Sequence, residues 1–289
     1  MDVVQHFSKV RRDDGSPQRV VVDDNLVVEL LCAGDPDVFA AHELTNLAFM
    51  TELYPPALPN TAPGLRTLWL NRSGTVTLDM IPAHDAELTD LDGLRDALQG
   101  LGEKPSLAQI FAWWDAWDLP ENVRAHSMTV AWAAYTLGVM LRKRGMHLDP
   151  ILAHRGGLVL DLDKIETLHL QGAHGVRSKS FLGEQGYPIL AEMVSDHIMH
   201  TILEPDAAER RWESKLVFFC DKCVEGDQIV TFDQRLEKLQ ERYPQYQQSM
   251  LQAEGPIWAL SDQICSILGM ARHAGMIAML KELKIKRLG

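Results

Sequence analysis

The sequence from Asn122 to Leu141 reads NVRAHSMTVAWAAYTLGVML, and its pattern predicts one long helix with a buried face. Apolar residues recur at the three- and four-residue intervals that place side chains in a single helical stripe: Val130, Ala133, Leu137 and Leu141. His126 falls in the same stripe. We therefore expect its imidazole ring to point into the protein rather than into water.

The whole chain has 289 residues, 46% of them hydrophobic, which is enough for two modest domains or one large one. Its formal net charge of −12 repels nucleic acid, and its basic residues are scattered. The longest apolar stretch, Met128 to Leu141, contains polar residues and is too short to cross a bilayer. The N-terminal residues lack the pattern of a signal peptide. We expect a cytoplasmic protein with neither nucleic-acid nor membrane partners.

Residues 1–82 predict a small α/β module. Arg19 to Val22 and Leu26 to Leu31 are β-branched or aliphatic runs that favour strands, and Ala40 to Leu53 favours a helix. The Ser-Gly pair at 73–74 separates two further apolar runs, which indicates a hairpin.

Residues 83–117 predict a helical connector that ends in a cluster of tryptophans: Trp113, Trp114 and Trp117. We interpret this cluster as a packing seam between domains rather than a platform that stacks a ligand, because tryptophans this close together usually fill core volume. Residues 118–289 predict an all-α domain. The expected fold class is therefore α+β, with a small α/β module followed by helices.

Two sequence signals mark the starts of helices in the all-α region. Asp118, with Glu121 three residues later, resembles a capping box. Asp149 followed by Pro150 is typical of a helix start as well. Further helices are expected near Arg235 to Tyr243 and over Trp258 to Leu283.

Polar residues also occupy apolar faces beyond the first long helix. Asp161, His197 and Asp221 each share a stripe with aliphatic residues, and a buried carboxylate is costly unless a cation or several donors meet it. A shared metal ion would satisfy these side chains together with His126. Imidazole and carboxylate ligands suit a divalent transition metal such as Mn, Fe, Zn or Ni.

The four cysteines are few and irregularly spaced, which favours reduced thiols over a disulfide framework. Cys220 and Cys223 flank Asp221 in a CxxC pattern, which could mark a redox pair or half of a zinc site. A CxxC without a partner pair does not make a structural zinc site, so we interpret both cysteines as small core residues.

Several ordered motifs between residues 118 and 240 resemble the HD-domain superfamily of metal-dependent phosphohydrolases. They are the run Asn122–Leu141, the segment GLVLDLDK at 157–164, His174 before Gly186-Tyr187-Pro188, His197, and LVFFCDK at 216–222. The resemblance implies a metal-ligand set that consists of His126, Asp161, His174, His197 and Asp221. It also implies that Asp161 bridges two ions and that Lys164 lies near the substrate phosphate.

The chain departs from the family pattern at Leu160, which stands where the histidine of the His-Asp signature belongs. Leucine cannot donate a lone pair, so one metal position would lose a ligand. Asp161, His174 and His197 would still resemble a site with two histidines and one carboxylate. Asp163 replaces a small residue of the signature, and we expect it to add negative charge near any phosphate.

The N-terminal module is similar in order to the opening portion of the formate dehydrogenase accessory sulfurtransferases, over Leu26–Leu31, Leu47–Leu53 and Gly64–Leu78. The sulfur-carrying CxxC loop of that family is absent. HD domains of this type also occur attached to molybdenum-cofactor enzymes, so the two resemblances point to one pathway.

Two functions follow from these patterns. The first is a degenerate HD-domain phosphohydrolase that acts on a small phosphate ester or nucleotide, with Asp161 and Lys164 as catalytic residues. The second is a non-catalytic accessory or binding protein that uses the HD helices as a scaffold for a partner protein, in the maturation of a molybdenum enzyme.

Overall fold

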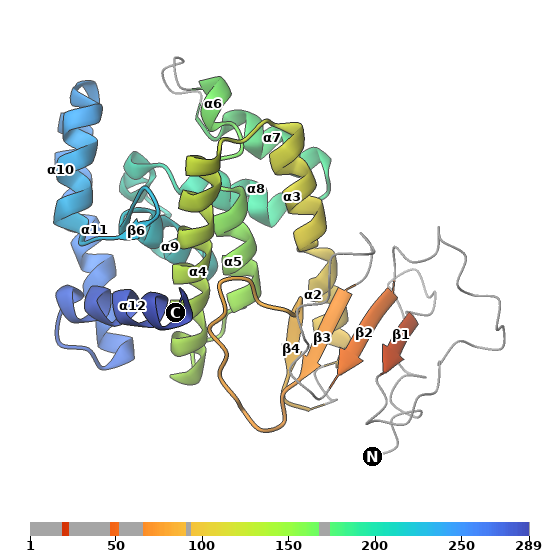
Figure 1. Ribbon diagram of the computed structural model, residues 1–289. Coiled ribbons are helices and arrows are strands. Elements are labelled where there is room, and N and C mark those ends of the chain that lie inside the picture. Colours follow the sequence, from red (N-terminus) through yellow and green to blue (C-terminus); the bar gives the residue numbers. More distant parts are fainter. Residues whose placement is uncertain (1–18, 23–46, 52–65, 91–93, 168–173, 289) are drawn as a thin grey trace. The chain divides into compact units, whose positions relative to one another are not determined.

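A computed structural model describes residues 19–22, 47–51, 66–90, 94–167 and 174–288 (Figure 1). The chain forms two compact units. One holds the described residues up to Thr77 together with Ile81–Ala112, and the other holds Leu78–Met80 and Trp113 onward. The first unit contains a small parallel sheet and the second is mostly helical, as the composition of the two regions predicts.

The first unit is built on a four-stranded parallel sheet in the order β1-β2-β3-β4 (Figure 1). Its strands are β1 (Arg19–Val22), β2 (Leu47–Thr51), β3 (Arg66–Leu70) and β4 (Ala86–Leu88). Helix α2 (Leu94–Gly102) packs against β4, and the Arg66 guanidinium donates to the backbone oxygen of Leu101 at 2.6 Å. The apolar residues of β3 lie inside this unit, where Leu68 and Leu70 are almost fully buried.

The predicted strand at Arg19–Val22 is confirmed, but two other predictions for this unit are wrong. Leu47–Thr51 forms a strand rather than part of a helix, because it pairs on both sides with parallel neighbours. The hairpin at 73–74 is absent: β3 pairs with β4, and Asn71 closes a local turn through bonds to Thr75. The predicted strand at Leu26–Leu31 lies outside the described residues.

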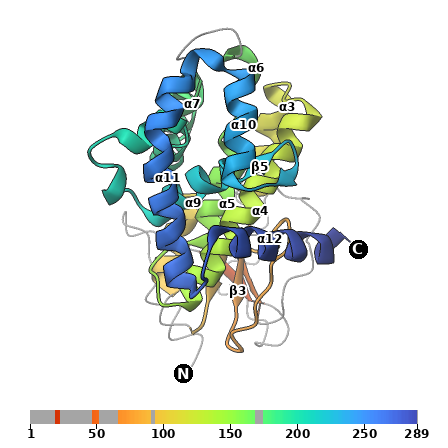
Figure 2. The ribbon, with the colours of Figure 1, turned by 90° about the vertical axis from the view of Figure 1, so that its left-hand side faces the viewer.

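The second unit packs its helices around α4, α5 and α9, and Figure 2 shows α10 and α11 in front of these three. Its elements after the last turn of α3 (Leu107–Ala116) are α4 (Glu121–Lys143), α5 (Pro150–Val159), α6 (Lys164–Thr167), α7 (Val176–Glu184), α8 (Pro188–Asp196), η3 (Met199–Leu203), η4 (Ala207–Glu209), α9 (Trp212–Asp221), β5 (Val224–Glu225), β6 (Gln228–Ile229), α10 (Phe232–Arg242), η5 (Pro244–Tyr246), α11 (Gln247–Leu268) and α12 (His273–Leu288). The short β5–β6 hairpin interrupts an otherwise helical unit.

The core of the helical unit is the contact between α4 and α5. A Cβ atom on Gly157 would lie 2.4 Å from the Cα atom of Ala131, so the two backbones approach to a distance that a larger side chain would block. The apolar stripe of α4 is buried as predicted, and Trp132 beside it is fully enclosed. Its indole donates to the backbone oxygen of Leu78 at 2.9 Å.

One of the two predicted helix caps is confirmed. Asp149 caps α5, because its carboxylate accepts from the backbone N–H groups of Ile151 and Leu152 at 2.8 and 3.2 Å. Asp118 does not cap α4: it adopts a positive φ of 46°, and Pro120 is the N-cap without a side-chain bond. Proline fixes the extended backbone that precedes the helix, which leaves no place for the predicted box.

The tryptophan cluster serves packing within the helical unit. Trp113 and Trp114 are buried, and the indole of Trp114 donates to the backbone oxygen of Leu158 at 2.9 Å. Trp113 meets the rings of Phe181 and Tyr187 edge to face. These contacts tie the end of α3 to α5, α7 and α8.

Among the described helices, none is by itself long and apolar enough to cross a membrane. The segments Pro244–Leu268 and His273–Arg287 reach that length and composition only when taken together, across a bend of 69°.

We predict that Gly157→Ala destabilises the protein by about 1 to 3 kcal/mol, because the added methyl group meets the backbone of α4. Gly183→Ala is the matched control, since nothing lies within 4 Å of a Cβ there. The control should leave stability unchanged or raise it by up to about 1 kcal/mol. Urea unfolding followed by circular dichroism measures both, and equal midpoints for the two variants would contradict this account of the helix crossing.

Candidate metal centre

The five predicted ligands come from five different segments and meet in the helical unit. His126 lies on α4, Asp161 in the turn between α5 and α6, His174 just before α7, His197 at the end of α8, and Asp221 is the last residue of α9. All except His174 are buried. The helical packing therefore gathers residues that are up to 95 positions apart.

Three of these residues bring their ligand atoms together. His174 Nε2 lies 3.1 Å from Asp161 Oδ1 and 3.0 Å from His197 Nε2, and His197 Nε2 lies 3.9 Å from the same carboxylate oxygen. One ligand atom from each of the three residues lies within 4.8 Å of the other two. Asp161, His174 and His197 could therefore hold one metal ion.

The outer nitrogens of the two histidines support this assignment. His174 Nδ1 faces Asp163 Oδ1 at 3.1 Å, and His197 Nδ1 faces the backbone oxygen of Val194 at 2.5 Å. Oxygen acceptors at both Nδ1 atoms require hydrogens there, which leaves lone pairs on the two Nε2 atoms in the neutral rings. Two such nitrogens beside a carboxylate form a group that could hold a metal ion.

Without a metal ion, the two Nε2 atoms of His174 and His197 are 3.0 Å apart, so one of them must carry a hydrogen that the other accepts. Burial lowers the pKa of His174, but hydrogen bonds to Asp161 and Asp163 outweigh it and raise that pKa to about 9. Burial and the neighbouring charge of His174 lower the pKa of His197 to about 4. His174 therefore holds the proton at the position that a metal ion would take.

His126 and Asp221 form a second part of the site. His126 Nε2 lies 3.0 Å from Asp221 Oδ1 and 3.9 Å from Asp161 Oδ2. Lys222 Nζ donates to Asp221 Oδ2 at 2.5 Å, and an Arg235 nitrogen lies 3.9 Å from Asp221 Oδ1. Burial opposes ionisation of Asp221, but Lys222 and His126 hold its pKa well below the usual range.

The predicted set of five is thus divided. The ligand atoms of Asp161, His174 and His197 converge, whereas Asp221 is already neutralised by the buried cations Lys222 and Arg235. Leu160, the residue in place of the signature histidine, is fully buried at the end of α5. No donor reaches the His126 side of the cluster from that position.

Lys164 begins α6 and forms an ion pair with Asp161. Its Nζ lies 3.1 and 3.2 Å from the two carboxylate oxygens, and about a third of its side chain is exposed. Burial lowers the pKa of Lys164, but Asp161 and Asp221 outweigh it and raise that pKa, so the amine is charged. Lys164 therefore presents a positive charge beside the cluster.

A cavity of about 460 Å³ opens onto this cluster. Its lining includes polar and charged residues of the cluster, His174, His197, Asp221, Lys164, Lys222 and Arg235. It also includes apolar and aromatic residues, Leu239, Tyr243, Tyr246, Met250, Ile198 and Met199. The cavity therefore combines positive charge and metal-ligand atoms with apolar and aromatic walls.

Sequence reasoning missed the roles of Lys222, Arg235 and the two tyrosines. Arg235 shares a helical stripe with Phe232, Leu236 and Leu239, so the pattern that located His126 could have located it. The tyrosines carry no comparable signal, because they lie around the short η5 turn.

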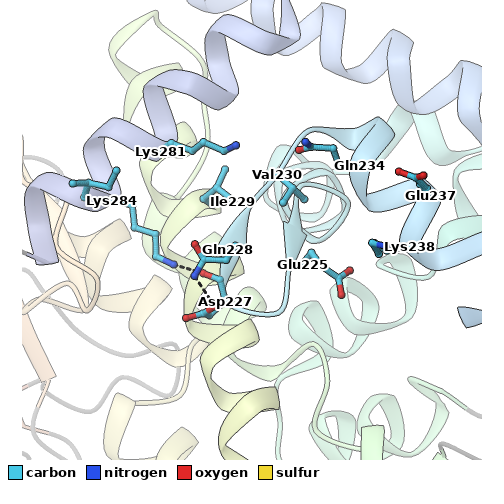
Figure 3. A pocket seen from close by; sticks show the side chains of 11 residues that line it. Glu225, Asp227, Gln228, Ile229, Val230, Gln234, Glu237, Lys238, Lys281 and Lys284 are labelled. Atoms are coloured by element: carbon cyan, nitrogen blue, oxygen red, sulfur yellow. Dashed lines mark hydrogen bonds between the residues drawn. The ribbon is translucent and has the colours of Figure 1, made fainter. Parts of the chain in front are cut away.

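The turn between β5 and β6 contacts the Nδ1 side of the His126 ring. The backbone oxygen of Gly226 lies 2.9 Å from His126 Nδ1, and the next carbonyl, at Asp227, accepts from Thr129 and from Lys284. Figure 3 shows Lys284 reaching this turn at the edge of a second cavity, of about 640 Å³, between the turn, α10 and α12. The ring of His126 is therefore fixed by backbone as well as by Asp221.

Two interpretations made from sequence have different outcomes. Asp163 is fully buried and accepts from backbone N–H groups at the start of α7, and it is not among the residues that line the cavity. Cys220 and Cys223 are buried core residues with free thiols, as predicted. Burial raises the pKa of both thiols, so neither is a reactive thiolate.

No family model and no solved structure matches the chain. An uncharacterized protein of Methanocaldococcus jannaschii, MJ0778, is similar to it, with 26% identity over 159 residues. The aligned part covers 51% of this chain and 90% of that protein. The similarity therefore relates about half of this chain to a nearly complete protein, and it carries no activity with it.

We predict that the metal-free protein, prepared by chelation, loses stability as the pH rises from 6.5 to 9. Protonated His174 stabilises the fold fully below its unfolded pKa of 6.5, and this contribution disappears through its folded pKa of about 9. The loss should reach up to about 3 kcal/mol and should be absent in His174→Gln. Unfolding free energies measured across this range decide the matter, and a flat wild-type curve would contradict the assignment of the proton.

Proposed function

We propose that this protein is a degenerate HD-type phosphohydrolase that hydrolyses a small phosphate ester or nucleotide at a single metal ion. The observation that carries the proposal is the convergence of Asp161, His174 and His197, because both histidines line a cavity that Lys164 and Arg235 also line. The ordered motifs between residues 118 and 240 support the same family, and no family or structural match bears on it.

Asp161, His174 and His197 would hold the ion. A divalent metal in such a site lowers the pKa of a bound water and polarises a phosphoryl oxygen. Side chains of the cavity would bind the substrate. Lys164 and Arg235 would bind and orient the phosphate, since both are cations that line the cavity beside the ligand atoms.

The apolar part of the cavity would take the organic group of the ester. Tyr243, Tyr246, Leu239 and Met250 line the same cavity as Lys164 and Arg235. We expect a phosphate ester with an aromatic or other flat leaving group to bind better than inorganic phosphate, which has no organic group to contact these residues. A nucleotide is one member of this class.

Metal analysis with phosphate-ester turnover tests the proposal. Protein purified without chelator should contain close to one equivalent of a transition metal and should hydrolyse an aryl phosphate when Mn²⁺ is added. Asp161→Ala should abolish both properties. Asp206→Ala is the control, because Asp206 is exposed and its side chain makes no cap bond. Less than about a tenth of an equivalent of metal, with no turnover, would overturn the proposal.

Leu160→His tests whether the vacant ligand position is still organised around an ion. In the family that the chain resembles, a histidine at this position would join His126, Asp161 and Asp221, so Leu160→His should create a second metal position and raise the bound metal above one equivalent. Isothermal titration with Mn²⁺ or Zn²⁺ measures the stoichiometry. A single bound ion with an unchanged dissociation constant would show that residue 160 does not reach the cluster.

A second function is a non-catalytic accessory or binding protein. It is favoured by the buried cations Lys222 and Arg235, which neutralise Asp221 without a metal ion, and by the ion pair of Lys164 with Asp161. In that case the cavity would bind its ligand without turnover, and a partner protein should co-purify from the native host. Hydrolysis that is lost in Asp161→Ala would exclude this function.

A further inference from the structure

The Asp163 carboxylate is fully enclosed although it lies two residues from the candidate ligand Asp161. Its Oδ1 atom lies 3.1 Å from His174 Nδ1 and accepts from the Gly175 N–H at 3.0 Å. Its Oδ2 atom accepts from the N–H groups of Arg177 and Ser178, both at 3.1 Å. One carboxylate therefore binds the first turn of α7 and the ring of a candidate metal ligand.

This arrangement decides which nitrogen of His174 is available. An ionised carboxylate only accepts hydrogen bonds, so the hydrogen of a neutral His174 ring must lie on Nδ1. The lone pair is then on Nε2, which faces Asp161 Oδ1 and His197 Nε2 at 3.1 and 3.0 Å. With the opposite tautomer, an N–H bond would point at the position of the ion.

The backbone around Asp163 also prevents the carboxylate from moving. Gly175, the residue after His174, has a positive φ of 81° and is the N-cap of α7, and glycine has no side chain that could accept from the first N–H groups of the helix. Asp163 supplies the acceptor that the orphaned N–H groups of this turn require. The same carboxylate therefore fixes both the start of α7 and the orientation of the His174 ring.

We propose that Asp163 is the positioning residue of the metal centre: it selects the Nδ1–H tautomer of His174 and aims Nε2 at the ion. This inference rests on the proposed function, because it assigns a role toward the metal held by Asp161, His174 and His197. Partners of this kind on metal-binding histidines change metal affinity by about 10- to 100-fold when they are removed.

Asp163→Asn is the informative substitution because it keeps the shape of the side chain. If the amide oxygen faces Arg177 and Ser178, its NH₂ group faces His174 Nδ1 and favours the wrong tautomer. If the amide is flipped, the NH₂ group faces two backbone N–H groups and the start of α7 is destabilised. In either orientation, the introduced amide would fix the tautomer and the orientation of the His174 ring less well than the native carboxylate does.

The matched control is Ser178→Ala. The Ser178 hydroxyl accepts from the Asp163 backbone N–H at 3.0 Å and is fully buried, so its loss disturbs the same turn without changing the group that faces His174. Both variants should lower the melting temperature by a similar amount. Only Asp163→Asn should weaken binding of Co²⁺, by about 10- to 100-fold, and alter the visible absorption of the bound ion.

Titration of the full-length wild type and both variants with Co²⁺, followed by absorption and chelator competition, tests this assignment. Failure of the wild type to bind Co²⁺ would overturn the proposed function and the inference together. Binding by the wild type with an equal dissociation constant and spectrum in Asp163→Asn would overturn the inference alone, as would an equal loss of affinity in Ser178→Ala.

A second measurement does not depend on the variants. Long-range ¹H–¹⁵N correlation spectra of the Zn²⁺-loaded wild type report the tautomer of each histidine ring. His174 should carry its hydrogen on Nδ1. A hydrogen on Nε2 of His174 would overturn the assignment even if Asp163→Asn failed to fold.

Discussion

The close approach of α4 and α5 at Gly157 is the constraint on which the candidate site depends. Ala131 and Gly157 allow the two backbones to touch, and no larger residue fits between them. His126 lies five positions before Ala131 on α4, and Asp161 follows Gly157 by four positions. Each residue lies roughly one helical turn from this crossing, and His126 Nε2 lies 3.9 Å from Asp161 Oδ2.

Charge balance is the second constraint, because three carboxylates are buried around this crossing. Each has its own partners: Lys164 and His174 for Asp161, Lys222 and His126 for Asp221, and the first turn of α7 for Asp163. A buried carboxylate without such partners would cost several kcal/mol, roughly, in folding free energy. At Asp161 the Nε2 atoms of two histidines face one carboxylate oxygen, so a metal ion could replace the proton of His174 there.

Much of the helical unit could be predicted from sequence, because a buried stripe at helical spacing is a local signal. That signal located His126 on α4, and the Asp-Pro pair at 149–150 located the cap of α5. It failed for Leu47–Thr51, whose strand depends on parallel partners distant in the chain. It also failed for Asp163, because the same acidic residue can face a ligand or cap a helix. Only the fold shows that α7 begins beside it.

Leu160 has a more limited effect than its place in the signature suggests. It removes a donor near His126, and there Asp221 is paired with Lys222 and Arg235 instead of converging with the other ligand atoms. The His174 side does not depend on residue 160, since its geometry comes from Asp163 and from the backbone oxygen of Val194. One half of the cluster is thus an ion-pair network around Asp221, and in the other half the Nε2 atoms of His174 and His197 face the same oxygen of Asp161. Among the described residues, the group that could hold a metal ion therefore lies on the His174 side.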